Sequence, residues 1–196
     1  MLTKAERTKQ FILEKAAPIF NQKGVSGANI DVVLDATKLT KGCLYGHFEN
    51  KEDLALQVVD FMLDINGEKI LTTISRGKTA KAKVFAYLDF YKDPLDTYMG
   101  GGCPIFNMAV ESDDNFPAIK EKVAGVIRRG QEMFVAILNE GIRNGEFSDE
   151  LDTAVYAFKA VAAVEGALVM CRAMNMAKPM HGLIKSLKAE LESYAL

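Results

Sequence analysis

The segment TKGCLYGHFENKEDL, residues 40–54, carries the strongest indication of how this chain folds. Thr40 is a residue type that favours the N-cap of a helix, because its hydroxyl can accept a backbone N–H of the first turn. The segment 41–47 behind it is predicted to be a short helix. Leu44 and Phe48 are spaced to face inward, so this helix is expected to be anchored on a preceding one.

A second short helix is predicted directly upstream, over residues 30–37. Asn29 is placed to cap it, and Asp31 in its first turn suits the positive end of the helix dipole. A tight connection at residues 38–39 then leads into the helix at 41–47. Two short helices joined by such a turn form a helix-turn-helix, whose second helix can enter the major groove of DNA.

The side chains around the second helix suit contact with a nucleic acid. Gly42 has no side chain to hold the backbone away from a duplex, and Lys41 supplies charge for a phosphate or a base edge. Tyr45, His47 and Lys51 stand at the far end, where their polar groups can reach backbone phosphates. The alternative is an ordinary packed helix pair, in which His47 is a surface or packing residue.

Residues 40–54 closely resemble the recognition-helix signature of the TetR/AcrR repressors. That signature runs Ser or Thr, Lys, Gly, one variable residue, Leu-Tyr, His-Phe and Lys-Glu-x-Leu, in this order. The resemblance extends over about residues 7–55, because the spacing of the family's first helix is also present upstream. It implies a dimeric repressor that binds operator DNA. The residues expected to contact DNA are Asn29, Thr40, Lys41, Gly42, Tyr45, His47 and Lys51.

Two positions depart from the family's pattern. Lys38 stands where the family has a glycine in the turn, and Leu34 stands where it has a small residue in the preceding helix. Lys38 is therefore expected either to adopt a positive φ or to belong to a slightly different turn. Leu34 is expected to affect how the two helices cross.

The remaining sequence has helical periodicity throughout. A helix over residues 4–23 is expected to end at Gly24 and to be bent by Pro18 inside it. Asn50 is placed to cap a long helix that begins at Lys51 and extends to the low seventies. The fold class is therefore all-α. The further predicted helices cover residues 78–92, 104–112, 116–143, 150–174 and 180–194.

The net charge of the chain does not suggest a DNA-binding protein, but the distribution of its charged residues does. The net charge is −2 and the pI is near 5.8, yet residues 1–48 hold seven basic and four acidic side chains. No run approaches the roughly 20 apolar residues of a membrane span, and the charged N-terminus lacks the apolar segment of a secretory signal. A cytoplasmic location without membrane contact is predicted. The three cysteines suit neither a disulfide framework nor a metal site, and no metal or cofactor is expected.

Two domains are predicted: a helix-turn-helix domain at 1–50, and a helical bundle for ligand binding and dimerisation at 51–196. A strip of small residues in the helix at 150–174 would let two helices approach closely. With the helix at 180–194, it is expected to form a four-helix dimer interface; the alternative is tight packing inside one subunit. The strip consists of Ala157, Ala160, Ala163, Gly166 and Ala167.

Apolar and flexible side chains are the candidates for a ligand cavity in the bundle. A stripe of Phe and Met at helical spacing equally suits a plain core, and that alternative stays open. The candidates are Phe61, Met62, Ile65, Phe85, Leu88, Cys103, Phe106, Met133, Phe134 and Met170.

Cys103 carries a more specific hypothesis. It lies in the flexible segment 100–104, GGGCP, which opens a predicted helix, and a helix dipole would lower the pKa of its thiol. The segment is similar to that of a TetR subgroup with electrophile- and redox-responsive members. The alternative is a small residue at a helix start with no sensing role.

The favoured function is a homodimeric repressor that leaves its operator when a small molecule or a thiol-reactive inducer favours another conformation. A DNA-binding activator or architectural factor without an inducer is an alternative in the same fold. A helical-bundle enzyme is the alternative from another class, but no catalytic constellation is present. Glu111, Asp113 and Asp114 form an acidic cluster, interpreted as a solvated helix end or a weak metal site.

Overall fold

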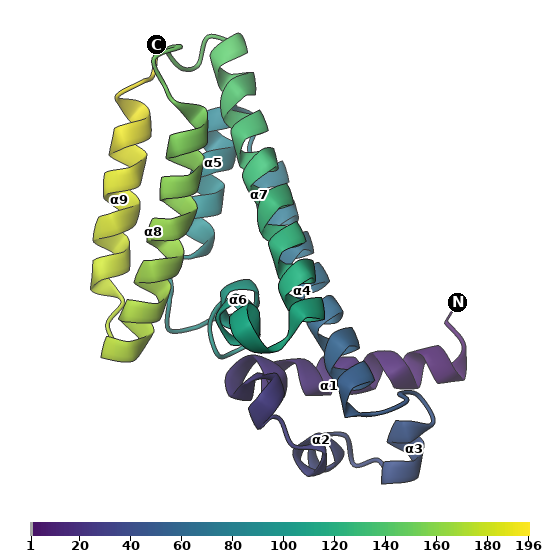
Figure 1. Cartoon of the computed structure of the whole chain (residues 1–196). Helices are drawn as coiled ribbons and strands as arrows, with labels where there is room; N and C mark the ends of the chain where they lie inside the picture. Colours follow the sequence, from purple (N-terminus) through teal and green to yellow (C-terminus); the bar gives the residue numbers. More distant parts are fainter. Residues whose placement is uncertain (1) are drawn as a thin grey trace. The chain divides into compact units, whose positions relative to one another are not determined.

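The computed structural model describes residues 2–196, and these are helical almost throughout (Figure 1). Within this range the only strand-like pairing is an isolated bridge between Phe147 and Ala195. The predicted all-α class is confirmed. The helices are α1 (Lys4–Gly27), α2 (Ile30–Thr37), α3 (Lys41–Tyr45), α4 (Lys51–Ser75), α5 (Ala80–Phe90), α6 (Pro104–Asn115), α7 (Pro117–Arg143), α8 (Thr153–Met174) and α9 (Lys178–Glu192).

The helices group into two compact units. The first unit runs to Asn66 and resumes over Tyr98–Ala124, and the second comprises Gly67–Thr97 and Gly125–Leu196. The division expected after residue 50 falls at the start of α4, whereas packing places the first part of α4 and all of α6 with the first three helices. That division stays a prediction about functional parts of the chain, because both α4 and α7 are continuous across the packing boundary.

Helix α1 is broken at a glycine and not at its proline. Thr3 and Glu6 form a capping box at its start, and Pro18 lies inside a run whose one non-helical residue is Gly24, with φ 73° and ψ 172°. The expected helix end at Gly24 is thus a kink, after which one further helical turn follows. Pro18 keeps helical backbone angles, whereas the break falls at Gly24, because glycine accepts that backbone conformation without strain.

Glu111 of α6 secures the kink from the same unit. Its carboxylate accepts the backbone N–H of Val25 at 2.7 Å and that of Ser26 at 2.8 Å. These amides open the short turn after Gly24 and have no partner within the helix, so an anion there is stabilising. A Cβ on Gly24 would lie 2.6 Å from the Glu111 Oε2, so a side chain there would be strained by the positive φ and would displace the Glu111 carboxylate.

Of the acidic cluster, Asp113 and Asp114 are exposed at the end of α6, as expected for a solvated helix end, whereas Glu111 has a structural role. Glu111 binds the two amides, and Asp113 forms an ion pair with Lys120 at 2.9 Å, which lowers the pKa of the Asp113 carboxyl through the Lys120 hydrogen bond and charge. Among residues 2–196 no group of three or more metal-ligating side chains is found. The metal alternative has no support here.

The substitution Glu111→Ala is expected to destabilise the protein by about 1–3 kcal/mol, because it leaves two amides near the kink without their acceptor. Asp114→Ala is the matched control, since Asp114 is an exposed carboxylate three residues further along α6. Urea denaturation of both variants measures the difference. Equal stability of the two variants would show that the Glu111 contact contributes nothing net.

Helix starts in the second unit differ slightly from the predicted ones because side chains cap them. The Thr79 hydroxyl accepts the N–H of Ala82, so α5 begins at Ala80 rather than 78. The Asp152 carboxylate accepts the N–H of Val155 at 3.0 Å, so α8 begins at Thr153 rather than 150. These caps fit the preference of Thr and Asp for the position before a helix.

Helices α8 and α9 run side by side in the second unit (Figure 1). The Tyr156 hydroxyl, on α8, donates to the Leu187 carbonyl of α9 at 2.8 Å. Ala157 and Ala160 are fully buried between elements of this unit. For these two alanines the alternative of tight packing inside one subunit is correct, and of the predicted strip Gly166 is exposed.

Helix α8 corrects one expectation from the sequence. Among the described residues it is the one helix long and apolar enough to cross a membrane, judged by length and composition alone, and core helices pass the same test. The run is hard to recognise in the sequence because Lys159, Glu165 and Arg172 interrupt it. Its inner face is packed against neighbouring helices, and its outer face is apolar and exposed.

Candidate nucleic-acid interface

Side chains cap the N-terminal ends of both α2 and α3. Asn29 Oδ1 accepts the N–H of Asp31 at 2.9 Å, and Thr40 Oγ1 accepts the N–H of Cys43 at 3.2 Å. Between the helices Lys38 adopts φ 57° and ψ 24°, which is the left-handed conformation. Of the two possibilities for Lys38, the positive φ is the one observed, at a cost of about 1 kcal/mol for a residue with a Cβ.

Helix α3 is shorter than predicted but is anchored as expected. It spans Lys41–Tyr45, and His47 lies in a turn where its N–H bonds to the Leu44 carbonyl at 3.0 Å. Leu44 and Phe48 are both buried, which confirms the inward positions predicted for them. Their burial leaves the opposite side of α3 facing solvent.

The residues predicted to contact DNA are accessible to solvent to different degrees. Five of the seven are exposed, while His47 and Lys51 are half-buried. A Cβ added to Gly42 would meet no atom within 4 Å, so the protein surface is open at that point. Because Asn29 Oδ1 is engaged by the cap, a phosphate contact would fall to its Nδ2. The exposed five are Asn29, Thr40, Lys41, Gly42 and Tyr45.

The turn that leads from α3 to α4 is held by a reciprocal cap. Asn50 Oδ1 accepts the N–H of Asp53 at 2.8 Å, and Asp53 Oδ2 accepts the N–H of Glu49 at 3.0 Å. Hydrogen bonds from Gln57 and from the Glu49 N–H hold the pKa of the Asp53 carboxyl below its ordinary value, so it stays ionised and keeps the cap. Lys51, between the capping residues, is thereby held at a defined place beside α3.

Two family models match this architecture. The model of bacterial regulatory proteins of the tetR family matches residues 12–58, and the tetracyclin repressor-like C-terminal domain matches residues 80–187. The chain belongs to the TetR family of transcriptional regulators. As a TetR-family member it is a DNA-binding regulator, and the helix-turn-helix identified from residues 40–54 is that of the family.

Similar solved structures cover the whole chain. A TetR-family regulator from Cytophaga hutchinsonii is 32% identical, with a TM-score of 0.89, over 100% of this chain and 98% of its own. A TetR regulator from Chloroflexus aurantiacus is also 32% identical, with a TM-score of 0.93, over 99% and 98%. The transcriptional repressor DhaR from Mycobacterium sp. is 23% identical over 88% of this chain and 86% of its own. These relatives are regulators rather than enzymes.

The predicted effector residues are divided between the two units. Five belong to the first unit and five to the second. Met62, Leu88 and Phe134 are fully buried side chains, as in a packed core, whereas Met170 on α8 is 61% exposed. The first-unit set is Phe61, Met62, Ile65, Cys103 and Phe106, and the second-unit set is Phe85, Leu88, Met133, Phe134 and Met170.

Cys103 occupies the N-cap of α6, at the end of the glycine segment. Gly100, Gly101 and Gly102 all have positive φ, which explains why this segment needs glycine. The Cys103 thiol is not in a disulfide and the residue is buried. In this conformation the thiol is therefore poorly accessible to an electrophile.

Asn66 is a candidate that the sequence pattern did not indicate. It is 1% exposed on α4, its Oδ1 accepts the Tyr98 hydroxyl at 3.3 Å, and its Nδ2 has no hydrogen-bond partner among the described residues. Desolvation raises the pKa of the Tyr98 phenol, so this hydroxyl stays protonated as a donor. The sequence did contain one indication of Asn66. This amide lies four residues after Met62 and four before Ile70, on the side of α4 that is buried. A buried donor without an acceptor is costly, and such groups are typical of ligand sites.

Proposed function

We propose that this chain acts in the cytoplasm as a homodimeric repressor, without enzymatic activity, which binds operator DNA through α3 and is released by a small-molecule inducer. The observation that supports it most directly is the open surface around Gly42. Lys41 and Tyr45 flank that opening on an exposed face, while Leu44 anchors the helix from behind. A short helix with this division can lie deep in a major groove.

Charge supports the same orientation. The first 48 residues carry an excess of three positive charges in a chain whose net charge is −2, so the remainder is acidic. An acidic remainder is repelled by DNA phosphates, whereas the helix-turn-helix is attracted to them. Binding is therefore expected to be steered toward α3.

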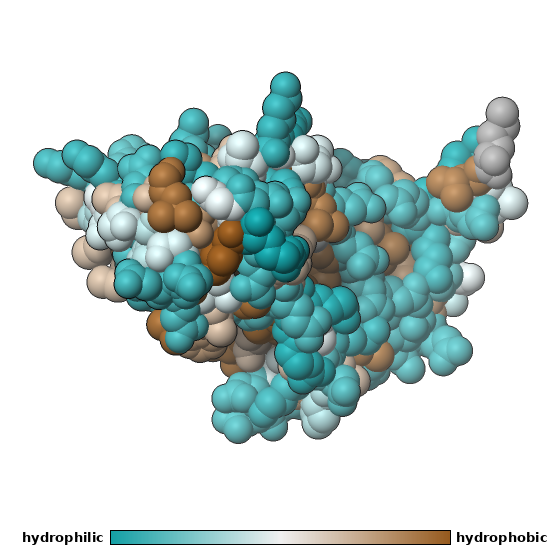
Figure 2. Space-filling model, turned by 90° about the horizontal axis from the view of Figure 1, so that it is seen from above, coloured by the Kyte–Doolittle hydropathy of each residue, from teal (hydrophilic) through white to brown (hydrophobic). Residues whose placement is uncertain are grey.

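Homodimerisation is supported by the outer face of α8. We define the α8 strip as the exposed small and apolar residues Val155, Phe158, Ala162, Gly166, Val169 and Met170. They recur at intervals of three and four and so form one continuous helical face. The face seen in Figure 2 is mainly hydrophilic, with apolar side chains emerging between charged ones. A continuous exposed apolar strip is typical of a protein–protein contact surface. Two copies of the strip, related by a two-fold axis, would cover each other.

Operator binding can be tested without knowing the operator. Repeated selection from random double-stranded DNA should yield a roughly palindromic sequence, with half-sites spaced for two heads. Fluorescence anisotropy should then show affinity that falls with salt, at a logarithmic slope of about −0.9 for each phosphate contacted. Failure to enrich any sequence, or the same affinity for selected and random DNA, would contradict the proposal.

For the inducer, we propose that Asn66 supplies the polar anchor. Its Nδ2 is a buried donor, so a carbonyl, carboxylate or ether oxygen of a ligand would satisfy it. Apolar neighbours along α4 such as Met62 would contribute the rest of the contact. Thiol modification at Cys103 is a second trigger that we propose, and it requires the thiol to become more accessible than in this conformation.

The substitution Asn66→Leu is expected to raise the stability of the free protein by about 1 kcal/mol, because it removes an unsatisfied buried donor at nearly constant volume. The hydrogen bond lost from the Tyr98 hydroxyl is long, at 3.3 Å, and Tyr98 is 41% exposed, so water can replace the acceptor. A purely structural asparagine would lose stability instead. Thermal melting of both proteins measures this. In the same assay, oxygen-bearing compounds that raise the melting temperature of the wild type should have a smaller effect on Asn66→Leu, and equal effects on both would contradict the anchoring role.

A further inference from the structure

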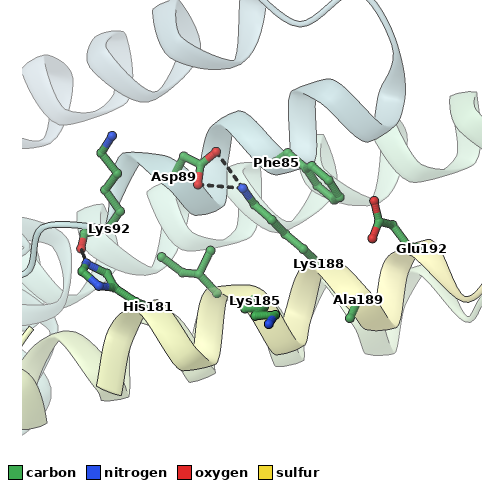
Figure 3. Close-up of a pocket in the computed structure, with 9 residues that line it drawn as sticks. Phe85, Asp89, Lys92, His181, Lys185, Lys188, Ala189 and Glu192 are labelled. Atoms are coloured by element: carbon green, nitrogen blue, oxygen red, sulfur yellow. Dashed lines mark hydrogen bonds and ion pairs between the residues drawn. The ribbon is translucent and has the colours of Figure 1, made fainter. Parts of the chain in front are cut away.

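A groove lies between α5 and α9 within the second unit, and none of its lining residues belongs to the helix-turn-helix (Figure 3). Its volume is about 480 Å³, which is within the range of small-molecule sites. Of the predicted effector residues, Phe85 is the one that lines it. The full lining is Phe85, Asp89, Lys92, His181, Ile184, Lys185, Lys188, Ala189 and Glu192.

The two ends of the groove differ in chemistry. Figure 3 shows His181 and Lys92 at one end, with the Phe85 ring and Glu192 toward the other. Ile184 is nearly fully buried and supplies an apolar floor between them. A ligand with a polar head and an apolar body would therefore have one preferred direction in the groove.

The centre of the groove is preorganised by Lys188. Its Nζ lies 2.7 Å from both carboxylate oxygens of Asp89 and 4.8 Å from the centre of the Phe85 ring. The ion pair neutralises both charges, and the lysine stem lies along the aromatic face. These three side chains from α5 and α9 hold one another in place without a ligand.

Outside the Lys188–Asp89 pair, the groove carries two lysines, Lys92 and Lys185, against one carboxylate, Glu192, which Figure 3 shows toward the opposite end from Lys92. Lys92 and Lys185 are exposed, and among residues 2–196 neither has an ion-pair partner. His181 Nε2 lies 3.0 Å from the Lys92 carbonyl, and because a carbonyl can only accept, Nε2 carries the hydrogen. With its hydrogen on Nε2, the His181 ring presents at Nδ1 a lone pair that can accept a hydrogen bond but cannot donate one to an anion.

From this arrangement we propose that the α5–α9 groove binds a small organic anion: an aromatic or alkyl body on Ile184 and Phe85, with a carboxylate or sulfonate head held by the ammonium groups of Lys92 and Lys185. The groove is a ligand site separate from Asn66, which belongs to the first unit. It does not depend on the DNA-binding role, because none of its residues lies in the helix-turn-helix.

The test compares two fluorescent probes that differ in one group. Anilinonaphthalene sulfonate carries an anionic head on an aromatic body, and N-phenylnaphthylamine has the same body without the head. The wild-type protein should bind the sulfonate about tenfold more tightly, a typical value for one charge-assisted contact. The double variant Lys92→Glu with Lys185→Glu should remove that preference. Lys178→Glu is the matched control, since it makes the same change at a position of α9 outside the groove.

The binding site of the sulfonate probe is determined independently by NMR. The methyl signal of Ile184 should shift when the sulfonate is added to the wild type or to Lys178→Glu. Equal affinity for the two probes, an unchanged sulfonate affinity in the double variant, or an unmoved Ile184 signal would each overturn the proposal. Operator binding by the same preparations shows whether the regulator function is intact, so the two proposals fail separately.

Discussion

The substitution Gly42→Glu should lower affinity for the selected operator on the order of 100-fold, because like charges brought together at an interface cost several kcal/mol. The fold itself should tolerate the change. Gly42 lies inside α3 with no atom within 4 Å of an added Cβ, and its φ is not positive. A side chain there would project from the exposed face of α3, where a phosphate or base edge is expected.

Gly67→Glu is the control for this experiment. Gly67 also lies inside a helix, α4, with nothing within 4 Å of a Cβ, but far along the chain from α3. Anisotropy with the selected DNA should show wild-type affinity for that variant. Gly42→Ala adds a graded test, since it should stabilise the short helix by about 0.5–1 kcal/mol while still weakening operator binding. Operator affinity that is unchanged in Gly42→Glu would show that α3 does not enter the groove as proposed.

The substitution Val169→Glu should convert the dimer to monomers, with the dimer dissociation constant rising on the order of 100-fold or more. Val169 is 60% exposed within the α8 strip. Covering such a side chain contributes about 1.5–3 kcal/mol, and a two-fold axis makes every substitution count twice. Phe158→Glu, at a position 66% exposed, should act in the same direction.

Val110→Glu is the matched control for dimerisation. Val110 is 81% exposed on α6 and lies outside the α8 strip, so its replacement should leave the dimer intact. Sedimentation velocity at several protein concentrations separates the two outcomes. Operator affinity should fall together with dimerisation in Val169→Glu, because one head reads one half-site. A Val169→Glu protein that remains dimeric would place the interface elsewhere.

Features that depend on neighbouring residues could be predicted from the sequence. The caps at Asn29, Thr40 and Asn50 are present, because each uses a side chain and an amide two or three residues away. The burial of Leu44 and Phe48 follows from a helical spacing of four. The positive φ at Lys38 was one of two possibilities, and choosing between them needed the path of the chain on both sides.

Contacts between residues far apart in the chain could not be predicted from the local sequence pattern. Ala157 and Ala160 have the same small side chains as an interface strip, yet they are buried inside the unit, and the exposed face of α8 is set by how α9 packs against it. The orphan amide of Asn66 and the contact between Glu111 and the amides after Gly24 also join residues far apart in the chain.

The order of residues along the chain was enough to predict the helix-turn-helix and the side chains expected to face DNA, because capping bonds and helical periodicity act over at most four residues. Helix packing was needed to establish which side of α8 is free, where Asn66 lies, and that α5 and α9 enclose a groove lined by Lys92 and Lys185. Those outcomes depend on which helical faces pack together. Apolar attraction is non-directional, so it drives burial without specifying the partner until the whole chain has folded.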